Sequence, residues 1–194
     1  MQKIAYSLTE LLINEQIINK EEKEIYFYGL QLALCCGLTS VTILAIGWCT
    51  RQLFWTICFM TALVALRHYT GGYHAQSYFQ CFMLTISVYL LMLLSKDYIA
   101  PLCSSQGLIG GSLVACAYLL YKGSINSKKN PKTKEEMQQR KRRARSLVIL
   151  YSLAVSIIRM EFINWLPLAW ILFYTQVVVA LGLWVVEKIG RNER

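Results

Sequence analysis

The sequence predicts an all-α, polytopic membrane protein with about six transmembrane helices and an N-terminal amphipathic helix. Of its 194 residues 56% are hydrophobic and only 16% are charged, whereas a soluble domain carries about 25% charged residues. Long uncharged stretches also alternate with short charged segments along the whole chain, a pattern typical of bilayer-crossing helices and the turns between them. This composition excludes a disordered chain and argues against an ordinary soluble enzyme, so residues 1–194 are expected to form one integral membrane domain.

Six stretches of the chain contain no Asp, Glu, Lys or Arg. They are residues 25–50, 52–66, 69–95, 98–121, 146–158 and 162–186. Four of them exceed the roughly 20 residues that a helix needs to cross the hydrocarbon core. The stretch at 146–158 reaches working length if Arg159 and Glu161 sit at the far interface as a pair, and the stretch at 52–66 remains short by this rule.

The expected elements follow from these stretches in chain order. Residues 1–27 read as an amphipathic helix, because Ile4, Leu8 and Leu11 recur at helical spacing while Glu10 lies off that stripe. No basic segment precedes an apolar run there, so no signal peptide is expected. The predicted transmembrane helices cover about 28–49, 52–66, 79–95, 105–121, 146–163, and from after Pro167 to about Val186.

The positive charge of the chain is concentrated in one predicted loop. Residues 122–145 hold ten Lys or Arg against two Glu, which is +8 of the total net charge of +9. Lys and Arg are retained on the cytoplasmic side of membrane proteins, so this loop, both termini and the segment 67–81 are expected to be cytoplasmic. Nothing around the loop resembles a nucleic-acid fold, and no nucleic-acid partner is expected. Binding of an anionic partner is an additional role for Arg140, Lys141, Arg142 and Arg143.

The segment 67–81 is the one polar stretch that could carry out chemistry. It contains both histidines of the chain, Cys81, and the pair Gly71-Gly72. A thiol beside an imidazole is the minimum for nucleophilic acyl chemistry, because the imidazole accepts the thiol proton and later returns it to the leaving amine. On a continuous helix His74 and Cys81 would lie about 10.5 Å apart. The chain must therefore turn between them, and if the following helix starts near Tyr78, Cys81 lies in its first turn.

The other polar residues of this segment have more than one reading. Arg67 could extend its charge to the membrane surface or anchor a substrate carboxylate. Gln76, Ser77 and Gln80 are candidate orienting or oxyanion-stabilising groups, and His74 itself could be ordinary polar surface. The spacings of six and seven residues between the two histidines and the cysteine match no common zinc pattern, so neither a metal nor a cofactor is expected.

Together these residues resemble the accessory gene regulator B family, the membrane-embedded cysteine endopeptidases of Gram-positive bacteria that mature quorum-sensing peptides. The resemblance covers most of the chain, including the basic segment with Asn130-Pro131. Its most specific part is the pattern Arg67, Gly71-Gly72, His74-Ala75 and Cys81, followed by an apolar stretch.

The resemblance implies a function. His74 and Cys81 take the positions of a catalytic dyad, supported by Arg67, Gly71 and Gly72. Cys81 would cleave a small peptide precursor through a thioester and release its acidic C-terminal tail, and an internal Cys or Ser of the precursor would close a thiolactone or lactone ring. Membrane lipids are the other expected partner, and the lipid-facing surface leaves room for a homodimer. The alternative is a non-enzymatic transporter or peptide-binding subunit, which predicts ionisable groups near the middle of the spans.

Overall fold

The computed structural model describes residues 2–70, 78–122 and 134–192, and within these ranges the regular structure is helical. The all-α class predicted from the sequence is therefore confirmed. The long helices are α1 (Gln2–Asn14), α2 (Lys23–Cys49), α3 (Leu53–Thr70), α4 (Tyr78–Tyr98), α5 (Ser105–Lys122), α6 (Lys134–Glu161) and α7 (Leu166–Asn192). Short 3₁₀ turns lie at Lys20–Glu22, Ala100–Leu102 and Ile163–Trp165.

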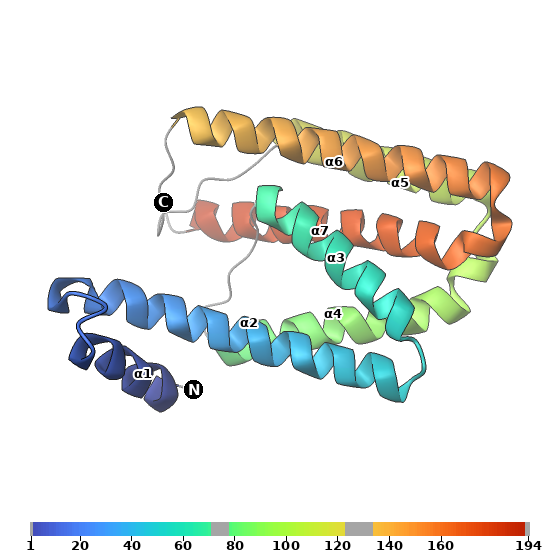
Figure 1. Ribbon diagram of the computed structural model, residues 1–194. Helices are drawn as coiled ribbons and strands as arrows, with labels where there is room; N and C mark the ends of the chain where they lie inside the picture. Colours follow the sequence, from blue (N-terminus) through green and yellow to red (C-terminus); the bar gives the residue numbers. More distant parts are fainter. Residues whose placement is uncertain (1, 71–77, 123–133, 193–194) are drawn as a thin grey trace.

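The helices form a bundle in which α7 is central. Helices α5 and α6 lie side by side along one side of it, α3 crosses next to α7, and α2 pairs with α4 on the other side (Figure 1). Helix α1 folds back against the first part of α2. At one end of this bundle α3, α5 and α7 finish while α4 and α6 begin (Figure 1). We call it the basic end, because it carries the cations of the first turns of α6.

Four helices among the described residues are long and apolar enough to cross a membrane, and the protein is a membrane protein. They are Lys23–Cys49, Leu53–Thr70, Phe79–Tyr98 and Leu166–Lys188. Helix α3 belongs to this set because it is 18 residues long, longer than the stretch that predicted it. Helices α5 and α6 do not reach the same criterion, so the count of six spans stays a prediction. Both nevertheless pack along α7.

The predicted amphipathic helix over residues 1–27 is too long. Helix α1 ends at Asn14, and Gln16 has a φ of 54°, so the chain turns back there before α2 begins at Lys23. The turn brings α1 against α2, where Lys23 pairs with Glu10 and the rings of Tyr6 and Phe27 meet edge to face at 6.3 Å. The first transmembrane helix therefore starts five residues earlier than predicted.

Two predicted loops are partly helical. Helix α3 continues through Arg67 to Thr70, whose Oγ1 donates to the Leu66 carbonyl at 2.9 Å. Helix α6 begins at Lys134, so residues 134–145 of the predicted loop extend the helix predicted at 146–163. A charged residue ends the membrane-buried part of a helix without ending the helix, because only Gly, Pro or a turn interrupts the backbone hydrogen bonds.

Side-chain hydrogen bonds join the helices inside the bundle. Ser112 of α5, Ser152 of α6 and Gln176 of α7 are buried together: Ser112 Oγ donates to Gln176 Oε1 at 2.8 Å, and Gln176 Nε2 donates to Ser152 Oγ at 2.9 Å. Gln176 Nε2 also lies 3.1 Å from the Val148 carbonyl. Tyr151 of α6 donates to the Ala62 carbonyl of α3 at 3.1 Å. These neutral groups are paired, so they hold the helices together rather than marking an ion path.

Helices α2, α3 and α4 are joined near the end opposite the basic end. A Cβ atom added to Gly47 of α2 would lie 2.3 Å from Thr56 Oγ1 of α3, so only glycine fits there. Thr56 Oγ1 and the Tyr89 hydroxyl of α4 form a buried hydrogen bond of 2.7 Å. Farther along, Gln52 Nε2 donates to Asp97 Oδ2 at 3.0 Å, beside the buried Lys96. Lys96 and Asp97 therefore close α4 rather than forming a free loop.

Candidate active site

Cys81 lies in the first turn of α4, as the sequence predicted. Helix α4 begins at Tyr78, and the Cys81 side chain is partly exposed. Thr85 Oγ1 donates to the Cys81 carbonyl at 2.8 Å. The first backbone N–H groups of a helix have no acceptor within it, so the groups that precede Cys81 can donate to an oxyanion formed beside its sulfur.

A second thiol lies close to Cys81. Cys35 of α2 is buried on the face of α2 that packs toward the bundle, and the two thiols are near enough to interact electrostatically. No sequence pattern indicates this neighbour, because the two cysteines are 46 positions apart and no spacing rule connects them. Neither cysteine is part of a disulfide. The two thiols thus belong to helices that pack together, α2 and α4.

Arg67 lies at the same end of the bundle but on another helix. It is half-buried in the last turn of α3. Two residues later, the Tyr69 ring lies edge to face with His68 at 5.0 Å and 5.9 Å from the Arg143 guanidinium of α6. The structure thus places Arg67 on the helix that packs against α6, and Cys81 on the helix that packs against α2.

The remaining candidates divide into two groups. Gln80 is exposed in the first turn of α4, next to Cys81 in the chain. The others in this segment, Gly71, Gly72, His74, Gln76 and Ser77, lie outside the described residues. The pairing of His74 with Cys81 therefore stays a prediction from the sequence.

The cations of the basic end differ in their surroundings. Arg140 is half-buried, while Lys141, Arg142 and Arg143 are exposed on α6. Lys122 of α5 pairs with Glu187 of α7, and the hydrogen bond from this carboxylate raises the pKa of the Lys122 ammonium above its ordinary value. The first turns of α6 thus carry the cations that could attract an anionic segment.

Metal binding finds no support in the described part of the chain. Within residues 2–70, 78–122 and 134–192, His, Cys, Asp and Glu form no group of three that could hold a metal ion. An acyl-transfer reaction by a cysteine requires none.

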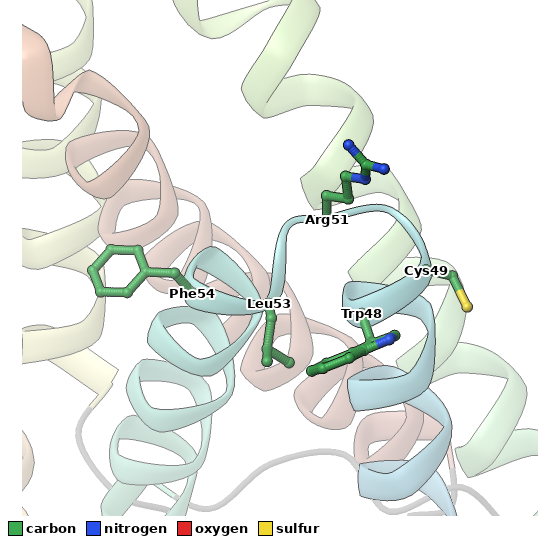
Figure 2. Close-up of a pocket in the computed structure, with 5 residues that line it drawn as sticks. All are labelled: Trp48, Cys49, Arg51, Leu53 and Phe54. Carbon is green, nitrogen blue, oxygen red and sulfur yellow. The ribbon is translucent and has the colours of Figure 1, made fainter.

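An open depression lies at the other end of the bundle, where α2 turns into α3. Its lining consists of Trp48, Cys49, Arg51, Leu53 and Phe54. Figure 2 shows Trp48 and Leu53 extending toward the space between the two helices, while Phe54 points away. The depression contains none of the predicted site residues, so it is not part of the candidate active site.

A comparison with protein-family models finds one described as accessory gene regulator B, which matches residues 4–186. The match includes all of the candidate site, from Arg67 to the basic turns of α6. No curated protein and no solved structure matches the chain.

Proposed function

The chain belongs to the accessory gene regulator B family, and from this premise we propose that it is a cysteine endopeptidase that matures an autoinducing peptide precursor. Membership of the family is consistent with a role in processing such precursors. The finer proposal assigns the nucleophile to Cys81 and the general base to His74. The observation that carries it is a partly exposed thiol in the first turn of a helix, seven residues after a histidine.

The proposed reaction has two acyl transfers. The Cys81 sulfur attacks the carbonyl carbon of the scissile peptide bond, and His74 accepts the thiol proton. The C–N bond then breaks, His74 returns the proton to the leaving amine, and the acidic C-terminal tail departs. An internal Cys or Ser of the precursor attacks the thioester next, which closes the ring and releases Cys81 as a thiol.

The first turn of α4 supports this chemistry. Backbone N–H groups at a helix N-terminus can stabilise the negative charge that develops on the carbonyl oxygen. The adjacent Gln80 side chain is exposed and is a further candidate donor. The packing of α4 against α2 keeps this turn at a fixed place in the bundle, which holds the nucleophile still while substrate binds.

The basic end supports recognition of an acidic tail. The first turns of α6 bring four cations into one helical segment, Arg140 to Arg143. We propose that this end faces the cytoplasm, where Lys and Arg are retained, and that the precursor reaches the site from that side. Potential from such a cluster is screened within about 8 Å at physiological salt, so it acts on a tail that already lies near the surface.

The test is cleavage of the precursor by purified protein in lipid vesicles. Cys81→Ala and His74→Ala should each abolish cleavage and ring formation without changing membrane insertion. Cys36→Ala is a matched control, because this thiol is exposed on α2 and takes no part in the proposed reaction. The covalent thioester on Cys81 should also be detectable by mass spectrometry of the intact protein.

Wild-type cleavage by Cys81→Ala would end the proposal. A protein that binds the precursor but never forms a thioester would instead act as a transporter or a peptide-binding subunit. The paired, neutral state of the buried Gln176 group gives no support to an ion-coupled transporter.

A further inference from the structure

The register between α3 and α6 is fixed by two contacts. The Tyr151 hydroxyl donates to the Ala62 carbonyl at 3.1 Å, and the Arg143 guanidinium lies 5.9 Å from the Tyr69 ring. These contacts are seven residues apart on α3 and eight residues apart on α6, so about 10–12 Å separates them along each helix axis. The two helices therefore run antiparallel with Arg143 held beside the last turn of α3.

This register distinguishes the four consecutive cations of α6 that begin at Arg140. The buried face of α6 includes Ala144, Val148, Tyr151 and Val155. Arg140 lies one turn before Ala144 on that same face and is half-buried, which places it just beyond the last turn of α3. Arg143 is a neighbour of Arg140 on the helix surface, because residues three apart share a face.

Lys141 and Arg142 have a different orientation. They are rotated by roughly 100° and 200° from Arg140 around the helix axis, and both are exposed. Arg142 therefore points away from α3, and Lys141 lies on the flank. Four consecutive cations in the sequence thus divide into a pair that faces the end of α3 and a pair that does not.

The charges of Arg140 and Arg143 are available to bind an anion. Within residues 2–70, 78–122 and 134–192 the side chains of Arg140 and Arg143 form no ion pair with a carboxylate. Glu187, a carboxylate at the same end, already pairs with Lys122. Glu136 lies one helical turn before Arg140 and is the acidic side chain nearest to it in the sequence. Arg67 is another cation at this end, on the last turn of α3, and it already has an interaction of its own.

We propose that Arg140 and Arg143 form a carboxylate-binding subsite for an acidic peptide, with Tyr69 as the residue that positions Arg143. A guanidinium over an aromatic face is attracted to the ring and loses orientational freedom. Tyr69 therefore holds the Arg143 fork at the end of α3, where it can bind a carboxylate in bidentate fashion. This proposal rests on the proposed function, since the acidic peptide it accepts is the tail of the precursor.

The test measures binding rather than cleavage. The probe is a fluorescently labelled hexaglutamate peptide, and a hexaglutamine peptide is its neutral control. The full-length protein is held in phosphatidylcholine nanodiscs, because a zwitterionic lipid adds no net charge of its own. Arg140→Gln and Arg143→Gln should each weaken hexaglutamate binding about three- to tenfold, as expected for loss of one charge-assisted contact, and should leave hexaglutamine binding unchanged.

A matched control removes the same charge elsewhere on α6. Arg145→Gln acts on an exposed arginine outside the four consecutive cations and should change the affinity by less than about twofold, since Arg145 is rotated by roughly 140° from Arg140 around the helix axis. Tyr69→Leu should weaken binding as Arg143→Gln does, whereas Tyr69→Phe, which keeps the ring, should restore it. A merely structural role for Tyr69 would not depend on the charge of the probe.

The binding measurements test the carboxylate-binding subsite, and they are independent of the cleavage assay that tests the proposed function. Equal weakening by Arg140→Gln, Arg143→Gln and Arg145→Gln would show an unspecific basic surface and overturn the subsite. Unchanged binding by Tyr69→Leu would remove the positioning role. Loss of precursor cleavage by Cys81→Ala is read in a different assay, so catalysis can fail while the subsite stands, and the reverse.

Discussion

The contact between α2 and α3 at Gly47 predicts a large effect from the smallest possible substitution. In Gly47→Ala the new Cβ would lie 2.3 Å from Thr56 Oγ1, 2.9 Å from Thr56 Cβ and 3.0 Å from Thr56 Cγ2. Carbon atoms reach their optimal separation at about 3.5–4.0 Å, so the helices or the Thr56 side chain must move by about 1 Å. Thr56 cannot move freely, because its Oγ1 bonds to the Gln52 carbonyl at 2.9 Å and to the Tyr89 hydroxyl at 2.7 Å.

The expected loss of stability is the balance of three contributions. Overpacking a well-packed interior costs about 1–3 kcal/mol, and an interhelical hydrogen bond in a membrane averages about 0.6 kcal/mol. Alanine favours a helix over glycine by up to about 1 kcal/mol, which offsets part of this cost. We therefore expect Gly47→Ala to lower the free energy of unfolding by about 1–3 kcal/mol.

The measurement is denaturant titration of the purified protein in mixed micelles, followed by helical circular dichroism. Gly37→Ala on the same helix is the matched control, because a Cβ there meets no atom within 4 Å. Adding Thr56→Ala to Gly47→Ala removes the contacts at 2.3 and 3.0 Å and should recover part of the loss. Equal stability of Gly47→Ala and Gly37→Ala would refute the close approach of α2 and α3.

Two further predictions concern other parts of the molecule. Gln176→Leu should lower the free energy of unfolding by about 1 kcal/mol, because it leaves the buried Ser112 and Ser152 hydroxyls without their amide partner. The same denaturant titration measures this loss, and an unchanged unfolding midpoint would contradict the pairing. If the reaction passes through a Cys81 thioester, passing the acyl group to another thiol is close to neutral, so the cycle should be reversible. Cyclic product and excess tail peptide should then regenerate precursor, detected by mass spectrometry, with wild-type protein and not with Cys81→Ala; no precursor under conditions that allow forward cleavage would leave simple hydrolysis.

The sequence predicted the helical class and the start of α4 well, because both depend on local patterns. Uncharged length marks helices that cross a membrane, and the change from a polar segment to an apolar run placed Cys81 in a first turn. The C-terminal end of α3 and the N-terminal end of α6 were predicted less well. Arg67 and Arg145 interrupt the apolar pattern, yet both continue the helix that contains them.

The sequence pattern could not identify residues that are distant in the chain but close in space. The proximity of Cys35 to Cys81 and of Tyr69 to Arg143 depends on helix register, which is set by packing of the whole bundle rather than by spacing along the chain. A helical projection of α6 could have placed Arg140 on the same face as Tyr151. It could not have shown that this face meets α3.

The buried Ser112–Ser152–Gln176 group has a consequence for how the protein is made. Its three members come from α5, α6 and α7, and a ribosome synthesises them in that order. If α5 and α6 cross the bilayer, as the sequence predicts, their hydroxyls have no glutamine to bond until α7 follows, and neither helix meets the criterion of length and hydropathy that α7 meets. We therefore expect α5 and α6 to be held in the bilayer weakly until α7 packs against both of them. A chain stopped before Gln176 would contain His74 and Cys81 but would lack the amide that bonds to Ser112 and Ser152.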